Sequence, residues 1–294
     1  MNLSHETETF VPSHVEMLQC PCCCSRNWKS AQRVRRASLS QCANCGLLAT
    51  TSFLKNHGDI DELYDVTQEN HEEYCERYLG SRLAFYRRVV LKLSPFLRNG
   101  RLLEIGSGYG YFLEVASLSG WKTEGVEISK YAAAVARSRG CQVHREDILT
   151  LPLPAESYDV VAMWDVVEHF LRPGEILRRC VELLRPGGAL VLRTPNARAL
   201  RDRGGLVRAA YRHLAYPANT PQHVFHFTPQ DLTTLVATLG LEDISVDSAG
   251  LWDECVVSGK YAVVRAGRWT LLRLAVALHW PYEFVLTATK SHLA

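Results

Sequence analysis

The sequence predicts an α/β protein in which a small metal-binding module precedes a doubly wound, mostly parallel seven-stranded sheet. Three observations carry this prediction. A glycine-rich turn, RLLEIGSGYG at residues 101–110, joins an apolar strand to a helical stretch. Apolar strand-like runs then alternate with amphipathic helical patterns, which is typical of parallel sheets covered by helices. Two CxxC pairs lie within the first fifty residues.

Length and composition set the limits of this prediction. The chain has 294 residues and is 47% hydrophobic, enough for one substantial core and a smaller module. The net charge of +2 gives a weak overall field and does not favour nucleic acid as a partner. The first residues, MNLSHETETF, lack an apolar export signal, and the apolar run at 269–280 is too short to span a bilayer. We therefore expect a cytoplasmic protein without disulfides.

The first predicted module, residues 15–55, contains two cysteine pairs about twenty residues apart. This spacing is typical of a zinc ribbon, in which two knuckles supply four thiolates to one tetrahedral Zn²⁺. Four thiolates fill the coordination shell, so the site would be structural rather than catalytic. Cys22 remains an alternative ligand, and reduced loop cysteines are the alternative to zinc. The predicted ligands are Cys20, Cys23, Cys42 and Cys45.

The second predicted segment, residues 56–100, connects the zinc module to the sheet. Residues 56–70 are polar and acidic and read as a linker, and a helical pattern follows over 72–93. Pro95 and Gly100 end that helix. Its tyrosines and arginines, among them Tyr74 and Arg82, either line one wall of a ligand cleft or pack with their polar tips in water.

The remaining segment, residues 101–294, begins with the glycine turn. Gly106, Gly108 and Gly110 let the backbone turn sharply and let a ligand approach the main chain. The following helix points its free N–H groups at that ligand. The next strand ends at Glu127, where doubly wound folds bind a ribose diol in enzymes of several chemistries.

Further acidic residues follow the next two strands. Asp147 ends the third strand, where a carboxylate accepts a hydrogen bond from an adenine amino group. The apolar fourth strand, YDVVAMW, leads into Asp165, Glu168 and His169 at the edge where open parallel sheets bind ligands. ALVLRTPN, LEDISVDSAG and YEFVLTATK are the fifth, sixth and final antiparallel strands, and Thr228 caps a helix between them.

Five segments, EIGSGYG, GVEIS, EDI, YDVVAMWDVVEH and LRPGGALVLRTPN, resemble in order and spacing the class I S-adenosylmethionine-dependent methyltransferases. The resemblance covers about residues 80–250. The D-x-x-E-H run and the LRPGG turn distinguish it from NAD dehydrogenases. The N-terminal cysteines are similar to the zinc-binding head that precedes some of these domains, although Cys22 departs from that pattern. Such enzymes often act on sugars or other small metabolites.

The resemblance also implies which residues hold the cofactor. Its methionine portion would contact one carboxylate and the glycine loop, its ribose and adenine would contact the ends of the next two strands, and its methyl end would lie beside the fourth. For Glu104 and Asp165 the alternative is a carboxylate that caps the backbone. The residues implied for the methionine portion are Glu104, Gly106, Gly108 and Gly110. Those implied for the ribose and adenine are Glu127, Ile128, Asp147 and Ile148, and those implied beside the methyl end are Trp164 and Asp165.

A catalytic base is required only if the acceptor must lose a proton. The histidine candidates are His169, His223 and His226, and for each the alternative is an ordinary loop or core histidine. We favour His169 first, because it follows the fourth strand, and His226 second.

The insertion at 196–226 is rich in arginine. In such folds it covers the acceptor site, which suggests an anionic acceptor such as a nucleotide-linked sugar or a phosphorylated or carboxylated metabolite. The alternative is a solvated helix face. Residues 251–281 read as an extra packed helix, or else as a helix on a membrane surface. The arginines are Arg198, Arg201, Arg203, Arg208 and Arg212.

The function expected from the sequence is methyl transfer to a small-molecule acceptor. One alternative is an RNA methyltransferase that uses the zinc module and the arginines to bind nucleic acid. The near-neutral charge disfavours it, as does WDVVEH standing where an NPPY-like tetrapeptide would contact a flipped base. Another alternative is a binding protein that has kept the fold but not turnover, which the intact glycine strand disfavours.

Overall fold

A computed structural model of the chain describes residues 18–34, 37–50, 66–201, 223–248 and 283–292. Its centre is a seven-stranded sheet in the order β10-β11-β8-β7-β4-β5-β6. Six of the seven strands run parallel, and β11 alone is antiparallel to its neighbours β8 and β10. The predicted fold class is confirmed. The strands are β4 (Arg101–Ile105), β5 (Lys122–Val126), β6 (Gln142–His144), β7 (Tyr158–Trp164), β8 (Leu184–Pro195), β10 (Leu241–Ser248) and β11 (Glu283–Lys290).

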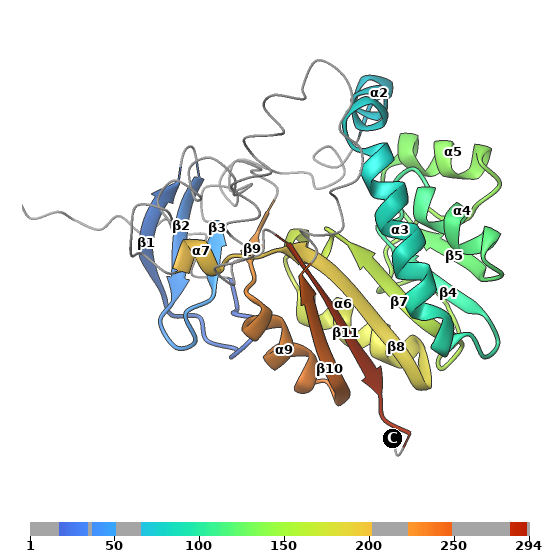
Figure 1. The fold of residues 1–294 in the computed structure, drawn as a ribbon. Coiled ribbons are helices and arrows are strands. Elements are labelled where there is room, and N and C mark those ends of the chain that lie inside the picture. Colours follow the sequence, from blue (N-terminus) through green and yellow to red (C-terminus); the bar gives the residue numbers. More distant parts are fainter. Residues whose placement is uncertain (1–17, 35–36, 51–65, 202–222, 249–282, 293–294) are drawn as a thin grey trace, which may run out of the picture.

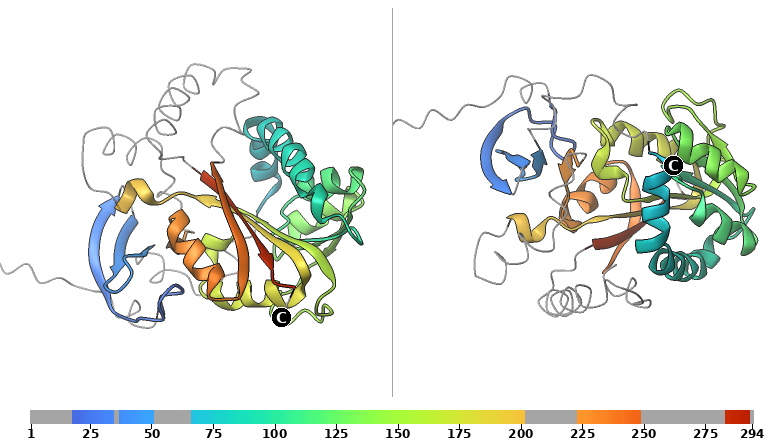
Figure 2. Two further views of the ribbon diagram at one scale, coloured as in Figure 1. Left: turned by 60° about the horizontal axis from the view of Figure 1, so that its bottom comes forward. Right: turned by 90° about the horizontal axis from the view of Figure 1, so that it is seen from above.

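Helices cover both faces of this sheet (Figures 1 and 2). Side chains alternate along each strand, so Leu102 of β4 packs on one face while Leu103 and Ile105 pack on the other. The first face is covered by α3 (Leu79–Leu93), α4 (Tyr111–Leu118) and α5 (Lys130–Ser138). The opposite face is covered by α6 (Pro173–Leu183) and α9 (Pro229–Ala237).

The helix predicted over residues 72–93 is two helices, α2 (Gln68–Arg77) and α3, separated at Tyr78. The backbone of Tyr78 is not helical, with φ −123° and ψ −26°. The two helices also differ in burial: α2 buries no side chain, whereas α3 packs five against the sheet. Without an apolar stripe of its own, α2 has no packing that holds it in line with α3.

The cysteine module, blue in Figure 1, forms three strands of a second, four-stranded sheet. Its strands are β1 (Trp28–Val34), β2 (Ala37–Cys42), β3 (Leu48–Thr50) and β9 (Phe225–His226). β9 comes from the segment just before α9, and it pairs Phe225 and His226 with Ala49 and Leu48 of β3. The end of the module at residue 55 stays a prediction. The small sheet takes β1, β2 and β3 from the chain before that residue and β9 from the chain after it.

The cysteine module and the large sheet share one apolar core. Leu18, Trp28 and Leu47 lie in the same buried cluster as Leu232 and Val236 of α9. The Trp28 indole N–H donates to the Leu18 carbonyl at 2.7 Å, which satisfies its polar end inside that core. The module is therefore packed on the sheet domain.

Short elements connect the remaining segments: η3 (Ser94–Phe96), η4 (Val167–His169) and α7 (Arg198–Arg201). The predicted cap of α9 is confirmed: Thr228 accepts from the Asp231 N–H, and Asp231 accepts from the Thr228 N–H. Within the part of the chain that the structure describes, no helix combines the length and hydropathy needed to cross a bilayer. The predicted helix at 251–281 lies outside the described residues.

Candidate active site

Two adjoining cavities lie at the carboxyl ends of β4, β5, β6 and β7. The larger has a volume of about 830 Å³ and extends from Glu127 to His169. The smaller, about 160 Å³, lies between the glycine turn and helices α2 and α3. Both are lined by Gly106, Gly108 and Asp165. The pair forms a continuous ligand site around the glycine turn, of the size expected for a small-molecule pocket.

The three glycines of the turn serve different purposes. All have positive φ, 69° at Gly106, 51° at Gly108 and 78° at Gly110. A Cβ at Gly106 would lie 2.5 Å from a methyl of Val166, and one at Gly110 would lie 2.9 Å from Ala136. A Cβ at Gly108 would meet nothing within 4 Å. Packing requires the first and third glycines, whereas only Gly108 leaves open space for a ligand.

Glu127 closes the turn from the next strand. Its carboxylate accepts hydrogen bonds from the Gly108 N–H at 2.7 Å and the Ser129 N–H at 2.8 Å. Burial raises the pKa of Glu127, and these N–H donors oppose that rise. Each carboxylate oxygen keeps a second lone pair for a ligand hydroxyl.

Glu104 is the buried carboxylate of the smaller cavity. It is 2% exposed, and its Oε2 has no hydrogen-bond partner among the described residues. Burial raises the pKa of Glu104 well above its usual value, and the nearby charge of Glu127 raises it further. A carboxylate that is buried and lacks a hydrogen bond on one oxygen is stabilised by a cation that enters the cavity.

The far wall of the larger cavity contains the predicted adenine contacts. Ile128 is 37% exposed and lines the cavity beside Asp147 and Ile148. The Asp147 carboxylate accepts from the Leu149 N–H at 2.9 Å. The structure therefore brings these three predicted residues together on the lining of one cavity.

Asp165 lies between the two cavities and has a left-handed backbone, φ 57°. Its Oδ2 is 2.8 Å from Arg82 of α3 and 2.6 Å from Arg193 of β8. These guanidiniums hold the carboxylate in place where the cavities meet. Trp164 instead points into an aromatic cluster, with its ring centroid 5.4 Å from that of Phe85, while lining the smaller cavity.

The three candidate histidines do not share one environment. His169 lines the larger cavity, and its ring centroid is 4.7 Å from that of His223. His226 is 1% exposed, and its Nε2 lies 2.7 Å from the Thr50 hydroxyl of the small sheet. Burial lowers the pKa of His226 to about 4. Neither cavity is lined by His226, so the geometry favours His169 as the base, and both roles stay predictions.

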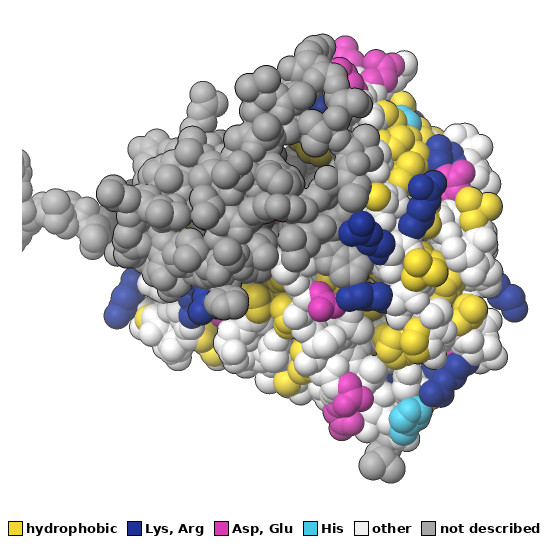
Figure 3. Space-filling view, in the orientation of Figure 1, with side chains coloured by type: hydrophobic (Ala, Val, Ile, Leu, Met, Phe, Trp, Pro, Cys, Tyr) yellow, Lys and Arg dark blue, Asp and Glu magenta, His cyan; other side chains and the backbone are white. Residues whose placement is uncertain are grey.

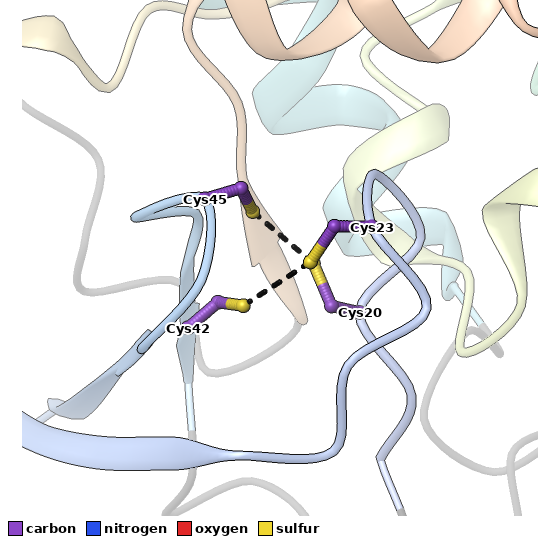
Figure 4. A group of neighbouring side chains, drawn as sticks. All are labelled: Cys20, Cys23, Cys42 and Cys45. Carbon is purple, nitrogen blue, oxygen red and sulfur yellow. Dashed lines mark hydrogen bonds between the residues drawn. The ribbon is translucent and has the colours of Figure 1, made fainter.

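The four predicted cysteine ligands converge from two turns of the small sheet (Figure 4). The Sγ atoms of Cys20 and Cys45 are 3.5 Å apart, as are those of Cys23 and Cys42, and all four lie within 4.8 Å of one another. Gly46 follows with φ 81° and donates to the Cys42 carbonyl. Cys22 is not part of this group of four: its thiol donates to the Asp231 carbonyl at 3.6 Å, although it also lies close to the thiol of Cys20.

Arg201, one of the arginines predicted to bind the acceptor, makes structural contacts within the protein. Its guanidinium pairs with Asp231 at 2.8 Å and donates to the Cys45 carbonyl at 3.1 Å. It therefore joins the cysteine module to the cap of α9. Arg198 is exposed, and Arg203, Arg208 and Arg212 lie outside the described residues.

Three site residues were not among those predicted to bind the cofactor. Tyr74 and Arg82 reach the smaller cavity from the connector helices, as one of the two sequence interpretations proposed. Arg193, fully buried on β8, fixes Asp165 through two hydrogen bonds. An arginine inside the apolar strand ALVLRTP is the signal that could have identified it, because buried cations require a partner.

The comparisons agree with this geometry. A family model described as a methyltransferase domain matches residues 78–246, more than half of the chain. The chain belongs to this family. Together with relatives named as S-adenosylmethionine-dependent enzymes, the match makes it an S-adenosylmethionine-dependent methyltransferase.

Two curated relatives of this methyltransferase are named ubiquinone biosynthesis O-methyltransferase. The protein from Idiomarina loihiensis is 28% identical over 155 residues, which cover 50% of this chain and 63% of that protein. The protein from a Caulobacter species is 36% identical over 131 residues, covering 39% of this chain and 51% of that one. This chain therefore spans between half and two thirds of each relative.

A solved S-adenosylmethionine-dependent methyltransferase from Thermotoga maritima has a similar fold. It superposes with a TM-score of 0.53 at 22% identity, covering 76% of this chain and 97% of that one. At this identity the likeness shows the fold alone.

The methyltransferase cavities suit S-adenosylmethionine on two structural observations. The ammonium of the cofactor's methionine portion would place a cation beside the buried Glu104, whose Oε2 has no hydrogen bond among the described residues. The open space at Gly108 lets the ligand lie against the backbone, and Glu127 presents carboxylate lone pairs beside it for a ribose diol. When bound there, the cofactor supplies an electrophilic methyl group.

Gly108→Ala is expected to weaken S-adenosylmethionine binding by at least about tenfold, because its methyl group would occupy the ligand's space. The positive φ adds a stability cost of about 1–2 kcal/mol. Gly140→Ala is the matched control: its φ is 83°, a Cβ there also meets nothing within 4 Å, and it lines neither cavity. Calorimetric titration should show unchanged affinity for Gly140→Ala. Equal losses in both variants would mean that backbone strain alone is responsible.

Proposed function

We propose that this methyltransferase transfers its methyl group to an oxygen of a small-molecule acceptor. The observation that carries the proposal is the apolar part of the lining of the larger cavity, to which Val166, Phe170 and Ile176 contribute together with His169. The curated relatives named as O-methyltransferases support oxygen as the reacting atom. A hydroxyl acceptor with an apolar or aromatic body suits such a lining.

The roles of the chain's own residues follow from their positions. Asp165, held by Arg82 and Arg193, forms a fixed negative edge where the two cavities meet. His169 is the histidine that lines the larger cavity, within four residues of Asp165, and would accept the hydroxyl proton. The apolar lining would orient the acceptor.

An anionic acceptor remains a prediction for the arginine-rich insertion. Arg201 does not support it, because its guanidinium forms an ion pair with Asp231. On the described part of the face in Figure 3, Lys and Arg side chains are interspersed with hydrophobic and acidic ones. That distribution favours a small molecule over nucleic acid, which binds to continuous basic surfaces.

Methyl-labelled S-adenosylmethionine tests this proposal. The purified chain is incubated with separate pools of hydroxylated aromatic metabolites, sugar nucleotides and RNA, and the label in each is counted. We expect incorporation into a small-molecule pool, with the label on oxygen. Label found in RNA alone would overturn the small-molecule proposal.

A structural Zn²⁺ in the cysteine module is a second part of the proposal. Its support is the convergence of four thiols from two turns, at spacings close to those of a tetrahedral thiolate site. Hydrogen bonding to Cys20 and burial raise the pKa of Cys45 well above its usual range. Four crowded thiols do not ionise together without a cation, and Zn²⁺ supplies one.

A further inference from the structure

A second group of metal-binding side chains lies beside the larger cavity. It consists of Glu168, His169 and His223, whose ligand atoms all lie within 4.8 Å of one another. Glu168 and His169 belong to η4, which directly follows β7 and Asp165. His223 comes from the segment that leads into β9. None of these residues belongs to the cysteine module, so the two groups are independent.

Glu168 is the unusual member of this group. It is 1% exposed, and neither carboxylate oxygen accepts a well-formed hydrogen bond among the described residues; the Thr194 side chain beside it acts as a weak donor. The His223 Nε2 lies 4.0 Å from its Oε1. A buried carboxylate with so little hydrogen bonding is costly unless it is protonated or binds a cation.

The backbone holds the three side chains together. The Val224 N–H donates to the Glu168 carbonyl at 2.9 Å, which joins the His223 segment to η4. β9 then pairs with β3, and the Thr50 hydroxyl contacts His226. The two chain segments are thus held by bonds that do not involve the metal-binding atoms themselves.

We propose that Glu168, His169 and His223 bind a divalent cation of the zinc type at the acceptor end of the larger cavity. Two imidazoles and one carboxylate are a donor set of catalytic zinc sites, in which a fourth position stays open. Zinc bonds of about 2.0–2.1 Å place ligand atoms about 3.3 Å apart, so the side chains need to approach by up to about 1.5 Å. Binding would require this movement of the three side chains.

The position of His169 gives the cation a role. Because His169 lines the larger cavity, the open coordination position would face the acceptor. A cation there would bind a hydroxyl oxygen and favour loss of its proton to water, which replaces His169 as the base. This role rests on the proposed function, whereas cation binding itself does not.

Zinc content tests the site directly. The full-length chain is loaded with Zn²⁺ alone, desalted, and its zinc per chain is measured by atomic emission. Wild type is expected to hold one equivalent more than Glu168→Gln, a variant of almost the same shape. His169→Asn should lose the same equivalent, and this variant decides the question if Glu168→Gln fails to fold.

The matched control is Glu146→Gln, which alters a carboxyl that lines the same cavity outside the group. It should keep the wild-type zinc content. Equal zinc in wild type and in folded Glu168→Gln and His169→Asn would overturn the inference. If the zinc difference is found but the methyl label enters RNA alone, the cation site stands and the small-molecule proposal falls.

Discussion

Glu104→Gln is expected to weaken S-adenosylmethionine binding by about 30-fold or more while making the ligand-free protein more stable. Losing one partner of a buried charge pair costs about 2–5 kcal/mol of binding energy, and each 1.4 kcal/mol is tenfold in Kd. The stability effect has the opposite sign. In the free protein Glu104 is buried and its Oε2 has no hydrogen bond among the described residues, so ionising it opposes folding.

The pH dependence follows from the raised pKa of Glu104. The unfolded chain loses this proton near the usual value of 4.5, whereas the folded chain loses it at higher pH. The wild type therefore loses stability as pH rises above about 4.5, until the folded pKa is reached. Glu104→Gln removes this loss, so the difference in Tm, variant minus wild type, should be positive at neutral pH and vanish below about pH 4.5.

The matched control for this experiment is Glu124→Gln. Glu124 lies on β5, outside both cavities, and pairs with Arg101 at 2.6 Å. Burial tends to raise the pKa of Glu124, but the Arg101 and Tyr158 hydrogen bonds outweigh it and lower the pKa. The variant should lower the Tm at neutral pH and leave cofactor affinity unchanged. A stability loss in Glu104→Gln, with cofactor affinity unchanged, would refute the assigned role of Glu104.

Cys42→Ser is expected to unfold the small sheet while leaving the cofactor cavity intact. Structural zinc contributes about 10–16 kcal/mol of apparent binding energy in small domains, comparable to the whole stability of a domain. Amide hydrogen exchange over β1, β2 and β3 should accelerate by at least about 100-fold. S-adenosylmethionine affinity should stay within about threefold of wild type, because the residues around its proposed site come from 66–176.

Cys24→Ser is the corresponding control. Cys24 lies next to Cys23 but is exposed and outside the four-cysteine group. It should keep the zinc content and the slow exchange of wild type. If Cys42→Ser matched Cys24→Ser in both readouts, the cysteine module would not be a structural zinc site.

The sequence predicted the large sheet well because each strand carries its own signal. Leu103, Val161 and Leu190 stand in short apolar runs bounded by turn residues, and such runs become buried strands in any parallel sheet. Gly106, Glu127 and Asp165 follow strands directly. Since the carboxyl ends of parallel strands meet at one edge, their positions in the site could be predicted from the order of the strands.

What the sequence did not reveal depends on contacts between distant segments. The pairing of β9 with β3 joins residues about 177 positions apart, and nothing local in VFHF indicates it. The same pairing buries His226, a candidate base, in the core. From the sequence, Arg201 was predicted to contact the acceptor. Only the fold shows that Asp231 and the Cys45 carbonyl lie beside it. Long-range packing of this kind overrides local residue patterns.

The most direct test of the central claim is a calorimetric titration of the folded, full-length chain with S-adenosylmethionine, set beside 5′-methylthioadenosine, which lacks the amino-acid portion. We predict saturable one-to-one binding of both ligands, with Glu104→Gln weakening the first by about 30-fold or more and the second hardly at all. Absence of saturable S-adenosylmethionine binding, or an equal effect of Glu104→Gln on both ligands, would contradict the account.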